Sequence, residues 1–146
     1  MNIKYRAKRV DNGEWVYGVP VPNSFGDKVF MIHLVLGDKV AFPLERLHEY
    51  CVEVVPETIG QFVGLTDDNH VEIYDGSVVL VSSDYGWSEV SEVVWGLSDK
   101  QYGNYPAFSM PNIETEMNSF AEVYDSGDYN IEIVGNIHDN PELIEK

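Results

Sequence analysis

The side chains with the best prospects for chemistry lie in one short segment, Asp67-Asp68-Asn69, together with Glu72 and Asp75. Clustered oxygen ligands on a loop suit a hard cation, so Asp67, Glu72 and Asp75 are the candidate ligands of a metal-dependent hydrolase. The segment lacks the spaced ligands and the glycine of a calcium-binding loop, and β-turns favour the same residue types. We therefore expect a turn here, with no metal and no cofactor.

Other catalytic patterns are weaker. Cys51 has His48 three residues before it, but on a strand that leads from a turn this spacing rarely aligns a thiol with a base. The segment Gly60–Gly64 has no lysine after it, so it is not a phosphate-binding loop. No close pair with zinc-site spacing occurs among the histidines, which are His33, His48, His70 and His138. We expect a protein that is not an enzyme, with the metal-dependent hydrolase as the alternative.

Aromatic and basic side chains point to protein contact instead. The chain has 3 tryptophans and 9 tyrosines, and both residue types anchor protein interfaces. Trp87, Trp95 and Tyr102 are interaction candidates because acidic residues surround them, although a role in the core is the alternative for each. Lys4 and Arg6 are candidates because they form a basic face on the first expected strand.

The charge is distributed unevenly along the chain. The net charge is −16; residues 1–50 carry 7 basic and 6 acidic side chains, whereas residues 51–146 carry 2 basic and 19 acidic ones. A surface of this sign repels phosphate, so we expect no direct nucleic-acid binding. It favours basic partners, and it also keeps a protein soluble, which is the simpler explanation.

The features that mark compartment favour the cytoplasm. Cys51 is the single cysteine, so no intramolecular disulfide is possible. The basic N-terminus is not followed by the apolar segment of a signal peptide. The longest apolar stretch, Val29–Leu36, contains His33 and is far shorter than the roughly 20 residues of a membrane span. We expect a cytoplasmic protein without a membrane segment.

The composition predicts a mainly β fold. Valine and isoleucine number 29 and aromatic residues 18, whereas alanine and leucine together number 12. Branched and aromatic side chains fit strands, and frequent turn signals indicate short antiparallel ones. We expect a mainly β or β-dominated α+β protein of small twisted antiparallel sheets. An SH3-like or related barrel over Glu57–Gly135 and a short C-terminal helical turn complete this prediction.

The clearest local pattern is an N-terminal hairpin. Ile3–Val10 alternates apolar and basic residues, Asp11-Asn12-Gly13 predicts a tight turn, and Glu14–Val19 returns. The remaining expected elements are a hairpin of Val29–Leu36 and Lys39–Phe42, a helical turn at Leu44–Glu49, a short helix within Glu114–Tyr124, a helical turn at Asn140–Glu145, and strands at Tyr50–Val55, Thr58–Gly64, Val71–Tyr74, Ser77–Ser82, Val90–Trp95, Gln101–Phe108 and Asn130–Val134. Ser77–Ser82 is expected at the centre of the core, with Val90–Trp95 as its partner. We expect one domain over residues 1–146, with a possible division into a hairpin part, 1–55, and a barrel-like part, 56–146.

Two segments are more specific than these patterns. The first is Pro56–Asn69, which continues through Glu72–Gly76, and the second is Val134–Leu143. Together with Lys4–Ala7 and Trp15–Gly18, they resemble, in the same order, the YopX family of phage and prophage proteins. The residues that carry the resemblance are Gly60, Gln61, Gly64, Tyr74, Gly76, Gly135, Asn136, Asn140 and Pro141.

The chain departs from the family pattern in two turns. His70 stands where the family usually has glycine, and Asp75-Gly76-Ser77 stands where it usually has Glu-Gly-Asp. His70 fits the same backbone in a left-handed conformation, which costs more for histidine than for glycine. The resemblance implies a phage or prophage origin and a small soluble protein, without a mechanism.

The function expected from these observations is that of a phage-encoded accessory protein without catalytic activity. It binds a protein partner or assembles with itself, as a homo-oligomer with the basic N-terminal hairpin in its interface. The alternative is an acidic DNA mimic that inhibits a basic DNA-binding protein. A mimic needs carboxylates spaced along one face like phosphates, so scattered acids would argue against it.

Overall fold

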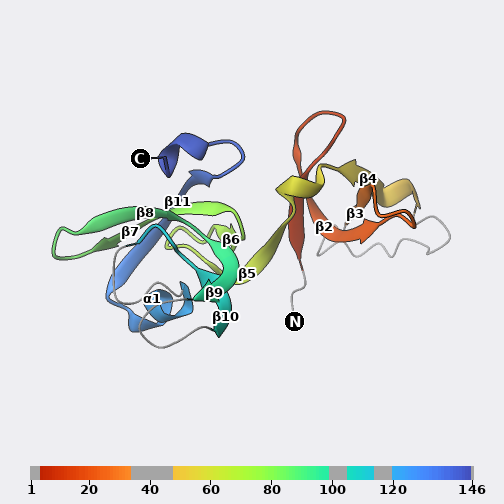
Figure 1. Cartoon of the computed structure of the whole chain (residues 1–146). Helices are drawn as coiled ribbons and strands as arrows, with labels where there is room; N and C mark the ends of the chain where they lie inside the picture. Colours follow the sequence, from red (N-terminus) through yellow and green to blue (C-terminus); the bar gives the residue numbers. More distant parts are fainter. Residues whose placement is uncertain (1–3, 34–47, 99–104, 114–119, 146) are drawn as a thin grey trace. The chain divides into compact units, whose positions relative to one another are not determined.

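The structure is a computed structural model that describes residues 4–33, 48–98, 105–113 and 120–145. Antiparallel strands dominate these residues, with one α-helix, α1 (Phe120–Ser126), and short 3₁₀ turns (Figure 1). The prediction of a mainly β fold is confirmed. The chain divides into two compact units, Met1–Phe62 and Val63–Lys146, which we call the N-terminal and C-terminal units.

The N-terminal unit is one antiparallel sheet whose strand order is β4-β3-β2-β1-β5. The predicted first hairpin is confirmed: Tyr5 lies opposite Gly18 and Lys8 opposite Trp15, and Gly13 takes a positive φ of 72° in the turn. The strands are β1 (Tyr5–Lys8), β2 (Trp15–Pro22), β3 (Val29–His33), β4 (Cys51–Val54) and β5 (Gly60–Thr66), of which β5 crosses the boundary between the units.

This sheet curls until β4 meets the end of β1. The N–H of Val10 donates to the carbonyl of Glu53 at 3.0 Å, and the N–H of Val55 donates to the carbonyl of Lys8 at 2.8 Å. Only the single bridge between Arg9 and Val54 joins the two strands within the described residues, so this sheet is not a closed barrel. The core of the unit consists of Ala7, Val16, Met31 and Val54.

The middle of the N-terminal unit can be compared with the sequence only in part. The strand expected from Val29 begins as predicted and pairs with β2 on one side and β4 on the other. The expected partner Lys39–Phe42 lies outside the described residues, as does most of the helical turn expected at Leu44–Glu49. The strand expected from Tyr50 is present as β4. The strand ends before Pro56, which begins the 3₁₀ turn η2 (Pro56–Thr58).

The C-terminal unit contains a three-stranded sheet of order β11-β7-β8 and a two-stranded sheet of β10 and β9, while the end of β5 pairs with β6. Ser77–Ser82, predicted at the centre of the core, lies in the middle strand of the larger sheet, and its Val79 and Val81 are fully buried. Val79, Val81 and Ile131 from this sheet join Met110 and Val123 in the core. The strands are β6 (Glu72–Tyr74), β7 (Ser77–Ser83), β8 (Ser88–Glu92), β9 (Val94–Ser98), β10 (Tyr105–Ser109) and β11 (Tyr129–Asn136).

Two predictions for this unit need correction. The expected strand Val90–Trp95 is divided at Val93, whose N–H donates to Ser77 and whose carbonyl accepts from Gly76, both at 2.8 Å. These bonds end the ladder, so β8 pairs with β7 and the chain then leaves as β9 to pair with β10. The expected barrel over Glu57–Gly135 is therefore wrong: the described strands lie in separate small sheets.

The helical predictions agree with the described residues. The helix expected within Glu114–Tyr124 is α1, which covers Phe120–Ser126, while residues 114–119 lie outside the description. The C-terminal helical turn is present as the 3₁₀ turn η3 (Pro141–Leu143), and Pro141 occupies its first turn as expected.

Candidate functional site

Asp67, the first metal candidate, is committed to the backbone. The residue is 5% exposed; Oδ1 accepts the N–H groups of Asn69 and Val71 at 2.9 Å each, and Oδ2 accepts the N–H of Ile133 at 2.9 Å. Burial raises the pKa of Asp67, but the backbone hydrogen bonds outweigh burial and hold the pKa below its ordinary value. The neighbouring Asp68 accepts the N–H of Ile131 at 3.0 Å. The two carboxylates thus satisfy N–H groups on the edge of β11 that faces away from β7.

The other two metal candidates also have partners within the fold. Glu72 accepts the hydroxyl of Tyr74 at 2.7 Å, and Asp75 accepts the N–H of Trp95 at 3.4 Å. Burial raises the pKa of Asp75; burial, and then the nearby charge of Asp75, raise the pKa of Glu92. In the described part of the chain, no three His, Cys, Asp or Glu side chains gather where they could hold a metal ion.

The residues that carry the family resemblance build turns. Gly76 has a φ of 91°, and its carbonyl accepts the N–H of Ile137 at 2.9 Å. A Cβ on Gly135 would lie 2.5 Å from Oδ1 of Asn140, so a larger residue would have to displace this side chain, which accepts the N–H of Asn136 at 3.3 Å. Asn136 Oδ1 accepts the N–H of His138 at 3.0 Å. These contacts fix the C-terminal turn against the β6–β7 turn.

The remaining residues that carry the family resemblance also have structural roles in strands and turns. Gly60 and Gln61 pair with Arg6 and Tyr5 across the β1–β5 ladder. Gly64 has a positive φ of 97°, and Tyr74 is 2% exposed. His70 has a φ of 63°, which confirms the expected left-handed conformation in the β5–β6 turn.

A basic–aromatic face lies on the outer side of β1 and β2 and consists of Lys4, Arg6, Lys8, Trp15, Tyr17 and Phe62. The guanidinium carbon of Arg6 lies 4.7 Å from the centre of the Trp15 ring, and Nζ of Lys8 lies 5.6 Å from it. Nζ of Lys4 lies 5.6 Å from the centre of the Phe62 ring. Tyr17 lies opposite Arg6 and is 40% exposed. The structure therefore places Lys4 and Arg6 together, as the alternation of β1 predicts.

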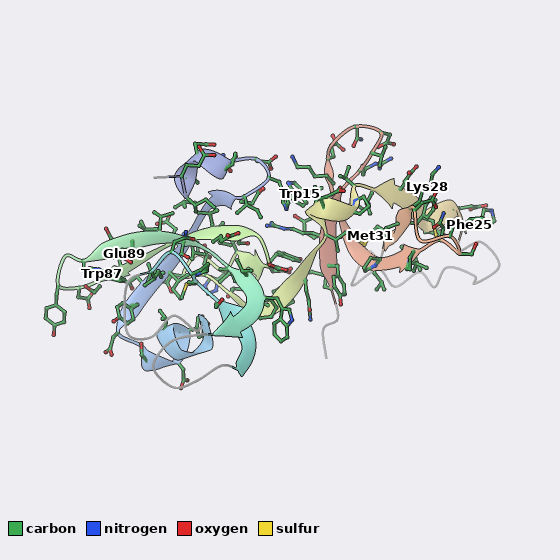
Figure 2. The ribbon with its side chains drawn as sticks, viewed as in Figure 1. Trp15, Phe25, Lys28, Met31, Trp87 and Glu89 are labelled. Carbon is green, nitrogen blue, oxygen red and sulfur yellow. The ribbon has the colours of Figure 1, made fainter. Side chains whose placement is uncertain are left out.

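An aromatic cleft lies in the C-terminal unit, where the β7–β8 turn meets the start of β11. It has a volume of about 470 Å³ and is lined by Ser83, Tyr85, Trp87, Asp128 and Tyr129. The rings of Trp87 and Tyr129 meet edge to face, with centroids 5.6 Å apart and planes at 66°. Figure 2 shows Trp87 beside Glu89 near the turn end of the hairpin. The sequence singled out Trp87, but not its partners Tyr129 and Asp128.

The other aromatic candidates are not part of this cleft. Trp95 is 55% exposed on β9, where its ring meets that of Phe108 edge to face at 5.0 Å. Tyr102 lies outside the described residues. Trp95 is thus an exposed aromatic supported by a neighbouring strand.

The acidic side chains of the larger sheet lie on both of its faces. Glu89 is opposite Val81 on the core side, whereas Glu132 is opposite Leu80 on the other side. Asp84 lies in the hairpin turn, and Glu142 lies in η3. In the described strands of the C-terminal unit, the acids therefore do not form one stripe along a single face.

Comparison with known proteins identifies the class to which this mainly β chain belongs. The model of the family described as YopX protein matches residues 4–145, so the chain belongs to the YopX family. Among solved structures, it is similar to protein EF1440 from Enterococcus faecalis, at 20% identity, with a TM-score of 0.48 and 99% of each chain covered. A comparison with curated proteins finds no match. Within the described residues, no helix is both long and apolar enough to cross a membrane.

Proposed function

We propose that this chain is a phage- or prophage-encoded binding module without catalytic activity, and that it associates with a second copy of itself. The observation that supports this most is the basic–aromatic face, where Arg6 lies over Trp15 beside Tyr17. Trp, Tyr and Arg are the residue types that most often dominate binding energy at protein interfaces. All three occur together on the outer side of the same hairpin.

Charge complementarity supports a second copy as the partner. The face carries Lys4, Arg6 and Lys8, whereas residues 63–146 carry 17 acidic and 2 basic side chains. Contact between the face of one copy and the acidic surface of another joins unlike surfaces, which gives a reciprocal two-fold dimer or a closed ring. The ring contact that holds Arg6 also reduces the side-chain entropy lost on binding.

Static light scattering on matched charge variants tests this proposal. Arg6→Glu reverses a charge on the face, and Lys28→Glu makes the same change of charge in the exposed β2–β3 loop (Figure 2). At about 50 mM salt, wild type and Lys28→Glu should both exceed the monomer mass of 16.5 kDa, and Arg6→Glu should approach it. Added salt should lower the wild-type mass, because exposed charge pairs are screened.

Two results would contradict the proposal: a monomer mass for wild type at every salt concentration, or equal masses for the two variants. Arg6→Glu also loses a cation–π contact, which is worth about 0.5–1 kcal/mol at an exposed site. Thermal unfolding of each variant therefore accompanies the mass measurement. If the Arg6→Glu protein is folded and still fully associated, the basic–aromatic face is not part of the interface.

A further inference from the structure

We infer that the aromatic cleft of the C-terminal unit binds a cationic side chain, specifically an arginine presented by a basic segment of another protein. The inference goes beyond the proposed function, because it concerns a different unit, different residues and a different ligand. Its volume of about 470 Å³ suits one inserted side chain with its flanking backbone.

The walls of the cleft offer aromatic surface in a fixed arrangement. Trp87 and Tyr129 are partly buried against the core, and the N–H of Ser83 donates to the carbonyl of Trp87 at 2.8 Å. Both residues line the cleft and are only partly buried, so part of their surface is open to a flat group that enters it. A planar guanidinium stacks on such rings better than an ammonium does.

Tyr85 adds a third ring that the fold does not require. It is 99% exposed at the tip of the β7–β8 turn, beside Gly86, whose φ is 89°. Turn positions of this kind favour small polar residues, and a fully exposed tyrosine buries almost no apolar surface. A ligand in the cleft would give this ring a contact.

The charges around the cleft select a cation. Asp128 lines it, and its N–H donates to the hydroxyl oxygen of Ser126 at 3.3 Å, which fixes its position after α1. Glu89 follows Trp87 by two residues and leaves the same face of the sheet, opposite Val81. No lysine or arginine occurs among the described residues of 63–145. The carboxylate of Asp128 in the lining disfavours an anionic ligand, whereas a guanidinium would gain both cation–π and carboxylate contacts.

Peptide titrations followed by NMR test the inference. The probe is a short arginine–glycine peptide, and its control replaces each arginine with citrulline, which has the same shape without the charge. The indole N–H signal of Trp87, assigned with Trp87→Phe, should shift with the arginine peptide while that of Trp15 stays in place. The citrulline peptide should bind at least about fivefold more weakly, because its neutral group loses both charge-based contacts.

Three variants connect this binding to the cleft. Asp128→Asn and Tyr85→Ala should each weaken binding of the arginine peptide about two- to fivefold. Asp84→Asn removes an acid that lies beside Tyr85 in the β7–β8 turn but does not line the cleft. It should therefore leave the affinity for the arginine peptide unchanged. Tyr85 and Asp128 are exposed, so neither change should disturb folding.

The inference is overturned by equal affinity for the two peptides, by no shift of the Trp87 signal, or by equal effects of Asp128→Asn and Asp84→Asn. It is also overturned if an oligosaccharide such as cellohexaose shifts the Trp87 signal and the arginine peptide does not, since the rings would then stack on sugar. None of these measurements depends on self-association. If the cleft does not bind arginine, the proposal that the basic–aromatic face mediates self-association is unaffected and is tested separately by light scattering.

Discussion

Replacing Asp67 with asparagine should destabilise the C-terminal unit by about 2 kcal/mol. The side chain is 5% exposed, and its two oxygens accept three backbone N–H groups. Asparagine keeps one oxygen for Asn69 and Val71 but turns an NH₂ group toward the N–H of Ile133. Leaving one buried donor unsatisfied costs about 1–3 kcal/mol, which sets the expected magnitude.

Urea unfolding followed by tryptophan fluorescence measures this change. Asp84→Asn is the control, because it removes the same charge from an exposed turn. Asp67→Asn should move the transition midpoint to a lower urea concentration, and Asp84→Asn should leave the free energy of unfolding within about 0.5 kcal/mol of wild type. Equal midpoints for wild type and Asp67→Asn would refute the role given to this carboxylate.

The same carboxylate gives an expected pH dependence. Since the folded-state pKa of Asp67 is lowered, its stabilisation is complete above the ordinary aspartate pKa of about 3.9. It is lost as the pH falls through the lowered value. The stability difference between wild type and Asp67→Asn should therefore be full at about pH 6 and should shrink below about pH 4. A difference that does not change with pH would contradict this reasoning.

Three further changes test other parts of the fold. His70→Gly should raise the free energy of unfolding by about 1 kcal/mol, because it relieves a left-handed φ of 63°; thermal melting against His70→Ala, which keeps the strain, measures the gain. Gly135→Ala should lower it by about 1–3 kcal/mol, because the new methyl group would lie 2.5 Å from Oδ1 of Asn140 and would displace its hydrogen bond from the N–H of Asn136; an unchanged melting temperature would show that Asn140 moves aside freely. Glu92→Gln should stabilise the protein at about pH 7 and have no effect near pH 4, because the raised pKa of Glu92 makes its charged form unfavourable only above the ordinary glutamate value; unfolding curves at both pH values decide.

The parts of the fold that follow from local sequence could be predicted. The first hairpin depends on alternation and on one Asp-Asn-Gly turn, and its partners are close in sequence. The strands Ser77–Ser82 and Asn130–Val134 were recognisable from their apolar residues alone. The division of Val90–Trp95 into two strands could not be predicted, because the hydrogen bonds at Val93, where β8 ends, join it to Gly76 and Ser77, which are distant in sequence.

In the candidate sites, too, features that depend on neighbouring residues could be predicted, whereas contacts between residues distant in sequence could not. Asp67 is a turn residue, as expected, but its bond to Ile133 spans 66 residues and no local pattern indicates it. Trp87 was chosen for its residue type, whereas its cleft depends on the pairing that brings Tyr129 opposite Ser83. Lys4 and Arg6 share a face by simple alternation, but their aromatic neighbours Trp15 and Phe62 require the pairing of three strands.

Site-specific photo-crosslinking from Tyr17 tests the proposed self-association most directly. Tyr17 is 40% exposed and lies opposite Arg6 in the basic–aromatic face, and p-benzoylphenylalanine in its place keeps an aromatic side chain there. Mixing isotope-labelled and unlabelled copies distinguishes crosslinks between copies from those within one chain. The account predicts mixed-label products that join position 17 to acidic segments within residues 63–146 of a second copy, and Arg6→Glu should abolish them. Crosslinks confined to single chains, or no crosslinks at concentrations where scattering is measured, would contradict it.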